Sequence, residues 1–244
     1  MVVTGHARAD YGRAVEKLAV RVPQVLHGRW GPGWLAGFAA EAADRTVALA
    51  AVRILDVEVL TAHLLSATPL STADTEILGQ ARGVFPLVDG PGEDTGVGLV
   101  RRARDWALVQ LARDCGADLD LPDHMIDLPA PAAPDAREQD WRAWSAALAA
   151  LAALAVPGLD SPLHRCAAAG GLALARGATR SVLRRDLPVA AALTRWLALP
   201  ALDASPLRTT LLIEHIAACD GTPRTLLHTQ IAAHLLHLRA GERS

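Results

Sequence analysis

The sequence has very little lysine, since Lys17 is the only one in 244 residues. Arginine supplies the other cationic side chains, and with so much alanine this bias favours GC-rich coding over an arginine-specific function. The formal net charge is −2, so the chain lacks the positive excess with which nucleic-acid-binding proteins neutralise phosphates. We therefore expect no nucleic-acid partner.

Cysteine is also scarce, and Cys115, Cys166 and Cys219 form no CxxC pair. Their wide spacing predicts reduced thiols, and the first ten residues contain no apolar signal-peptide region. An uncharged stretch of 17 residues between Arg142 and Asp160 is rich in alanine and contains a proline, which predicts a buried helix. We expect a cytoplasmic protein without a membrane span.

Several sequence signatures of catalysis are missing. The chain has no Gly-x-x-x-x-Gly-Lys-Ser/Thr loop, no strand followed by Gly-x-Gly-x-x-Gly, no Gly-x-Ser-x-Gly and no His-Glu-x-x-His. It also lacks the Asp-Asp-x-x-Asp run with which helical isoprenoid enzymes hold magnesium pyrophosphate. We expect no cofactor, and an enzyme is the less favoured class.

Apolar residues recur at helical spacing along nearly the whole chain, and no sustained alternation of β-branched or aromatic residues predicts a sheet. We expect an all-α fold of stacked antiparallel hairpins or an irregular helical bundle, with roughly 9–11 helices.

Pairs of a hydroxyl residue and a proline mark three helix starts in the C-terminal half. We expect one helix from Ser161-Pro162 to Gly177, a second from Ser205-Pro206 to Gly221, and a third from Thr222-Pro223 to about Arg239. Further upstream, helices are expected over 94–113, ended by Gly116, over 135–155, and over 71–82, where Ser71 and Asp74 resemble a capping pair. Residues 34–65 predict one long helix or two consecutive ones.

A proline-rich segment divides the chain. Residues 121–134 contain four prolines in 14 positions and cannot be helical throughout. We expect an N-terminal helical part over 1–120, a linker over 121–134 and a C-terminal helical part over 135–244, and the two parts could still pack as one domain.

Two stretches of the C-terminal part match each other. Residues 154–163, LAVPGLDSPL, align with 197–207, LALPALDASPL, and the register then brings Gly177 onto Gly221 and Arg180 onto Arg224 at an offset of 44 residues. In its length, its Pro-x-Leu-Asp corner and its Ser-Pro helix start, this unit resembles the helical hairpins of HEAT and armadillo proteins over about 154–240. The resemblance implies a helical surface that binds a partner, and it carries over no functional residues.

An acidic turn is the first candidate site. Asp118, Asp120, Asp123 and His124 have the oxygen-rich character that divalent cations prefer, but the glycine and glutamate of an EF-hand loop are missing. A solvated acidic loop is the favoured interpretation, and we predict no metal.

The expected helix over 206–220 carries the second candidate site. Arg208, His215 and Cys219 recur at intervals of seven and four residues on a face that should be buried, and Glu214 lies beside them. One interpretation is a polar pocket in which Glu214, His215 or Cys219 performs catalysis and Arg208 binds a ligand. The other is a buried structural histidine and thiol, with Arg208 and Glu214 paired toward solvent.

A glycine-rich loop between two tryptophans is the third candidate site. Trp30 and Trp34 flank a Gly-Pro-Gly sequence, and their rings could stack on a ligand or close the hydrophobic core beneath a tight turn.

These features favour a non-catalytic α-helical repeat protein that binds a protein or peptide. The alternative is a small helical enzyme or ligand-binding protein for a hydrophobic metabolite, with its pocket on the helix over 206–220.

Overall fold

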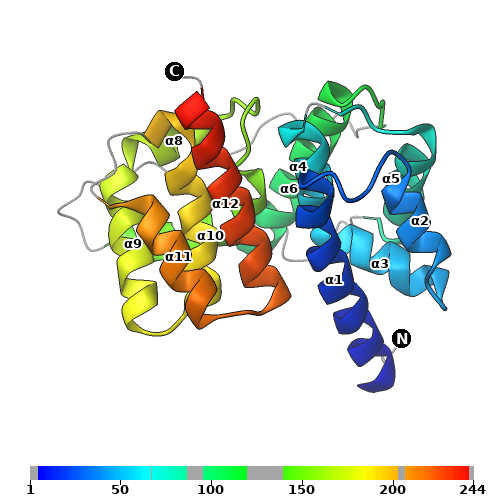
Figure 1. Cartoon of the computed structure of the whole chain (residues 1–244), viewed down its shortest axis with the longest axis horizontal. Coiled ribbons are helices and arrows are strands. Elements are labelled where there is room, and N and C mark those ends of the chain that lie inside the picture. Colours follow the sequence, from blue (N-terminus) through cyan, green and yellow to red (C-terminus); the bar gives the residue numbers. More distant parts are fainter. Residues whose placement is uncertain (1–4, 67, 87–95, 120–139, 203–206, 242–244) are drawn as a thin grey trace. The chain divides into compact units, whose positions relative to one another are not determined.

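The computed structural model describes residues 5–66, 68–86, 96–119, 140–202 and 207–241. The chain divides into two compact units, Met1–Pro122 (unit 1) and Asp123–Ser244 (unit 2). Every regular element within the described ranges is a helix, so the expected all-α class is confirmed (Figure 1). These ranges hold twelve α-helices, one more than the upper expectation. None of the helices in them combines the length and the apolar character needed to cross a bilayer.

Unit 1 contains six of the α-helices. They are α1 (Gly5–Leu26), α2 (Trp34–Ala40), α3 (Arg45–Leu55), α4 (Val57–Leu65), α5 (Thr72–Val84) and α6 (Gly96–Asp114). Helix α3 packs against α1 and α5, α4 packs against α1 and α6, and α2 packs against α5. All six helices contribute buried apolar side chains to the core of unit 1.

Residues 34–65 form three helices, where the sequence predicted one or two. The side chain of Asp44 accepts from the N–H groups of Thr46 and Val47 and so begins α3 at a defined residue. Between α3 and α4, Asp56 takes a positive φ of 55°, which breaks the helical path. The cap at Asp44 and the positive φ of Asp56 therefore divide an apolar stretch that looks continuous in the sequence into separate helices.

Two of the predicted helix boundaries in unit 1 are confirmed. The hydroxyl of Ser71 accepts from the N–H of Asp74 at the start of α5. At the end of α6, Gly116 takes a φ of 84° and its N–H donates to the carbonyl of Arg113 at 2.9 Å. The N–H of Ala117 donates to Ala112 at 2.8 Å, and this pair of bonds ends a helix on a left-handed glycine.

Unit 2 is arranged around one central helix, α10 (Leu187–Ala198). Its neighbours are α7 (Trp141–Ala150), α9 (Gly171–Leu183), α11 (Thr209–Cys219) and α12 (Pro223–Gly241). The shorter α8 (Pro162–Ala169) precedes α9, and 3-10 turns cover Ala152–Leu154 and Pro200–Leu202. Nine consecutive residues of α10, from Ala190 to Ala198, are buried, as a central helix requires.

The expected end of the first repeat helix at Gly177 is wrong. Gly177 lies inside α9, where a side chain would meet Ser145 of α7 at 2.6 Å, so this glycine lets two helices approach closely. Its aligned counterpart Gly221 lies between α11 and α12. The two matched stretches therefore have different helix boundaries.

Two of the other helix starts expected in unit 2 are observed, and one lies outside the described residues. Helix α8 begins at Pro162 after Ser161, and α12 begins at Pro223, as predicted. The expected start at Ser205-Pro206 and the expected linker over 121–134 lie outside the described residues. The helix expected over 135–155 is described as α7 and the 3-10 turn that follows it.

Candidate functional site

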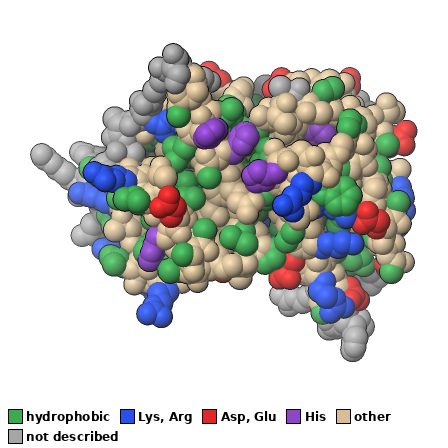
Figure 2. All heavy atoms as spheres, viewed as in Figure 1, with side chains coloured by type: hydrophobic (Ala, Val, Ile, Leu, Met, Phe, Trp, Pro, Cys, Tyr) green, Lys and Arg blue, Asp and Glu red, His purple; other side chains and the backbone are tan. Residues whose placement is uncertain are grey.

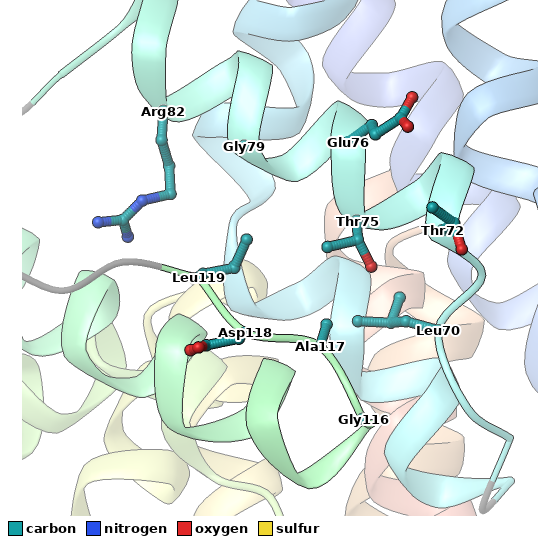
Figure 3. A pocket seen from close by; sticks show the side chains of 10 residues that line it. All are labelled: Leu70, Thr72, Thr75, Glu76, Gly79, Arg82, Gly116, Ala117, Asp118 and Leu119. Carbon is teal, nitrogen blue, oxygen red and sulfur yellow. The ribbon is translucent and has the colours of Figure 1, made fainter.

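A groove of about 540 Å³ runs along one face of α5 in unit 1 (Figure 3). Its first wall comes from α5, with Leu70 just before that helix, and its second wall is the segment that follows α6. The lining residues are Leu70, Thr72, Thr75, Glu76, Gly79, Arg82, Gly116, Ala117, Asp118 and Leu119. All ten belong to unit 1, so this single unit forms the groove.

Helix geometry explains the first wall. Thr72, Thr75, Gly79 and Arg82 recur at intervals of three and four residues and therefore share one face of α5. Figure 3 shows the two threonine side chains directed toward the opposite segment, with Arg82 farther along the same face. Because Gly79 has no side chain, it leaves open space in the middle of this helix face.

The second wall is held in place by the end of α6. Gly116 turns the chain in its left-handed conformation, and Ala117 to Leu119 then run past α5. The N–H of Leu70 donates to the carbonyl of Cys115 at 3.0 Å, which joins the two walls at one end of the groove. One backbone hydrogen bond therefore holds the two walls together at that end.

The polar groups of the groove differ in what they already contact. The hydroxyl of Thr75 donates to the carbonyl of Ser71 at 3.1 Å and keeps its oxygen as an acceptor. The carboxylates of Glu76 and Asp118 are exposed at the rim, and Asp118 lies 3.5 Å from the guanidinium of Arg113. The rim therefore carries two exposed carboxylates, one of which already lies beside an arginine.

Arg82 connects the groove to a buried ionic cluster. Its guanidinium lies 3.7 Å from the carboxylate of Asp105, which Arg53 approaches at 2.8 Å. Arg53 also lies 3.1 Å from the carboxylate of Asp56, and Arg104 lies 3.7 Å from it. Burial raises the pKa of Asp56 to about 6, against the opposite effects of Arg104 and Arg53.

A buried carboxylate fixes the opposite face of α5. Asp74 is fully buried and accepts hydrogen bonds of 2.9 Å from the N–H groups of Gly33, Leu35 and Ala36 at the start of α2. A carboxylate at that position satisfies donors that a helix leaves without intrahelical partners. The grooved helix is thereby attached to the core through α2.

The two loop tryptophans have different surroundings. Trp34 is only 3 % exposed, and its indole N–H donates to Nε2 of the buried His63 at 2.9 Å. The ligand-binding interpretation of Trp34 is corrected, because its ring is enclosed in the core. Trp30 is exposed and lies over the guanidinium of Arg21 at 4.2 Å, while its N–H donates to Gln24. A ligand-binding role for Trp30 stays a prediction.

The expected polar pocket of α11 is not where burial was predicted. Arg208, Glu214, His215 and Cys219 are all exposed, while α11 buries a stripe formed by other residues, Thr209, Ile213 and Ile216. The sulfur of Cys219 lies 3.9 Å from Nε2 of His215, both on the solvent side. The expectation of a buried polar stripe is wrong, and the chemical roles of these residues stay predictions.

The acidic turn is described only in part. Asp118 lies at the rim of the groove, whereas Asp120, Asp123 and His124 lie outside the described residues. Within the described part of the chain, no three histidine, cysteine, aspartate or glutamate side chains come together as metal ligands.

The sequence interpretation missed most of the groove. The spacing of Thr72, Thr75, Gly79 and Arg82 was a visible signal, since a glycine in the middle of a predicted helix weakens it and often has a packing or functional reason. The second wall could not be found this way, because it comes from a segment some 40 residues further along the chain, paired to Leu70 through backbone atoms.

Comparison of the chain with protein-family models, with curated proteins and with solved structures finds no match. The geometry of the described residues is therefore the basis for the function.

Proposed function

We propose that this protein is a non-catalytic binding protein whose groove along α5 takes a short extended peptide segment of a protein partner. The observation that carries the proposal is a groove of about 540 Å³, bounded by a helix face and an irregular segment that share polar and apolar side chains. Volumes of this size are typical of ligand sites in proteins.

The lining favours a peptide over a hydrophobic metabolite. Five of the ten lining residues have polar or charged side chains: Thr72, Thr75, Glu76, Arg82 and Asp118. Sites for apolar molecules are predominantly apolar, with few polar groups. A peptide carries a donor and an acceptor on each residue, which hydroxyl groups can bind, while Leu70 and Leu119 offer apolar contact.

The same lining disfavours catalysis. None of the ten residues is a histidine or a cysteine, and the hydroxyl of Thr75 donates to a backbone carbonyl, with no basic side chain as its acceptor. Nucleophilic catalysis by a hydroxyl requires a base within hydrogen-bonding distance. The groove therefore fits binding better than group transfer.

The charge of the rim indicates the partner's chemistry. Glu76 and Asp118 are exposed, whereas Arg82 lies close to Asp105. Because Asp118 lies beside Arg113, the exposed carboxylate of Glu76 is the group that favours a segment with a lysine or arginine beside its extended part. The cysteines form no disulfide, which supports a cytoplasmic protein. The resemblance of 154–240 to HEAT hairpins favours a protein that binds other proteins, although the two matched stretches differ in their helix boundaries and we place the site in unit 1.

A selection experiment tests the proposal. A phage-displayed library of random short peptides is selected on the immobilised full-length protein, and the enriched peptides are then measured by fluorescence anisotropy. The Gly79→Leu variant fills the groove, since a Cβ at Gly79 meets no atom within 4 Å and the new side chain enters open space. Gly83→Leu is the matched control, because Gly83 lies in the same helix with equally open space and does not line the groove.

We expect enriched peptides with at least one basic residue. They should bind the wild type and Gly83→Leu alike and bind Gly79→Leu more weakly by about tenfold or more. If no peptide is enriched, or if the enriched peptides bind Gly79→Leu as well as Gly83→Leu, the proposed site is wrong.

A further inference from the structure

Unit 2 carries an exposed apolar patch at the end of α9. Val182 of α9, Leu187 of α10 and Leu212 of α11 pack against one buried cluster. Beside them in the chain, Leu183 is 80 % exposed and Leu211 is 54 % exposed. Single exposed leucines are ordinary, but two exposed leucines beside the edge of one buried cluster enlarge the apolar area at the surface. These five residues are called the α9–α11 surface.

Positive charge surrounds this surface. Along α9, the turn after it and α11 with its two flanking residues, five arginines are wholly or partly exposed, against three carboxylates, those of Asp186, Glu214 and Asp220. The arginines are Arg176, Arg180, Arg184, Arg185 and Arg208. Figure 2 shows basic side chains together with hydrophobic ones over this part of unit 2. Within the described part of the chain, no ion pair engages Arg184, Arg185 or Arg208.

One of these arginines occupies a position that favours glycine. Arg185 has a φ of 58°, and its N–H donates to the carbonyl of Val182 at 2.9 Å. The N–H of Asp186 donates to the carbonyl of Ser181 at 2.8 Å, which completes the paired bonds that end α9. A side chain in this left-handed conformation is strained, and strained residues cluster where function requires them. Arginine at this turn therefore carries a backbone cost that glycine would not.

We propose that the α9–α11 surface docks an acidic amphipathic helix of a protein partner. The leucines bind the apolar face of such a helix, and its flanking carboxylates meet the arginines at the rim. This assignment gives a binding role to Arg208, the exposed residue that precedes α11, while His215 is exposed on α11 itself. It does not depend on the groove of unit 1.

A protein helix suits the surface better than an anionic membrane does. Asp186 and Glu214 stand among the arginines, and a sheet of lipid phosphates would repel both. In a helix interface, the same carboxylates can pair with single basic residues of the partner. A second copy of this chain would bring a second set of arginines to the contact, so like charges oppose self-association.

The test is a display library of helical peptides with leucines fixed at positions i, i+3, i+4 and i+7 and the other positions varied among Glu, Asp, Ser and Ala. The library is selected on the full-length protein. Selected peptides are measured by anisotropy against the Leu183→Glu/Leu211→Glu double variant and the Arg184→Glu/Arg185→Glu double variant. Val84→Glu is the control, because Val84 is 51 % exposed, much like Leu211, and belongs to unit 1.

We expect selected acidic helices to bind the wild type and Val84→Glu equally. Both double variants should weaken binding by about tenfold or more, and added salt should weaken binding to the wild type. Gly79→Leu should leave this binding unchanged, which separates the result from that of the groove.

Three results would overturn the proposal. The first is a failed selection: either no acidic helix is enriched, or the enriched peptides bind the Leu183→Glu/Leu211→Glu variant as tightly as the wild type. Another is concentration-dependent self-association in sedimentation velocity that the leucine variant abolishes, since the occupant is then a second copy. The third is flotation with phosphatidylserine-containing vesicles that the arginine variant abolishes, since the surface then binds lipid.

Discussion

The indole N–H of Trp34 donates to Nε2 of His63 at 2.9 Å inside unit 1, with both side chains buried. The histidine accepts this bond, so its Nε2 holds no proton and the ring is neutral. Burial lowers the pKa of His63, and the carboxylate of Asp74 and the backbone of Thr68 oppose this shift in part. The Trp34–His63 pair joins the start of α2 to α4 beneath the loop that carries Trp30.

This neutral histidine predicts a loss of stability in acid. The unfolded chain takes up a proton at His63 near pH 6.5, whereas the folded protein does so only at lower pH. The neutral His63 therefore contributes its full stabilisation above about pH 6.5, and this contribution is lost as the pH falls below that value. His63→Gln keeps an acceptor for Trp34 but does not titrate. Urea unfolding at several pH values should show a smaller loss for this variant, and identical pH profiles would contradict the assignment.

Asp56 predicts the opposite pH dependence. Burial raises the pKa of its carboxyl from 3.8 to about 6, so the folded protein holds this proton over a range in which the unfolded chain has released it. The proton on Asp56 therefore stabilises the folded protein by roughly 1–3 kcal/mol below about pH 4, and this stabilisation is lost as the pH rises through about 6. Asp56→Asn removes it, so the free energy of unfolding of the wild type should fall relative to this variant between pH 4 and 7. If the difference in unfolding free energy between the wild type and Asp56→Asn stays constant over that range, the raised pKa of Asp56 is ruled out. The control is Asp160→Asn, which changes an exposed carboxylate.

Asp74 predicts a large effect of one carboxylate on the fold. Asp74→Ala leaves the N–H groups of Gly33, Leu35 and Ala36 without their acceptor, and we expect a loss of roughly 3 kcal/mol in the free energy of unfolding. Asp44→Ala removes an exposed cap of α3 and should cost only about 1 kcal/mol. Chemical denaturation of both variants measures the difference, and equal losses would show that burial of Asp74 adds nothing.

Two helical glycines predict opposite effects of the same substitution. Gly79→Ala adds a methyl group in open space within α5 and should stabilise the protein by about 1 kcal/mol. Gly177→Ala brings a methyl group to 2.6 Å from Cβ of Ser145 and should destabilise it by roughly 1–3 kcal/mol. Thermal unfolding compares the two, and a stabilised Gly177→Ala would contradict the close approach of α7 and α9.

The sequence predicted the helical class and several helix ends because those depend on local chemistry. Ser71 with Asp74, Gly116 and Pro223 act within a few residues of their own position, so a single stretch of sequence contains the whole signal. Gly177 was misassigned because glycine serves two purposes. It can end a helix or admit a neighbour, and only the position of Ser145 on α7 separates these.

The candidate sites depended on contacts between distant segments and were harder to predict. The spacing of Arg208, His215 and Cys219 predicted that they share one helix face, but spacing alone does not tell which face is buried. Arg208 also lies just before α11, with a non-helical ψ of 88°. The burial of Trp34 depends on His63, which is 29 residues away, and the groove depends on the pairing of Leu70 with Cys115. None of these partners is visible in a local pattern.

The most direct test of the account is an NMR titration of the ¹⁵N-labelled full-length protein with a peptide enriched from the library of random short peptides. We predict that the amide resonances of Gly79 and Gly116, which line the groove, shift on binding, while those of Gly170 and Gly177 in unit 2 stay in place. If the Gly79 and Gly116 amides stay in place while the peptide binds, the groove along α5 is not the binding site.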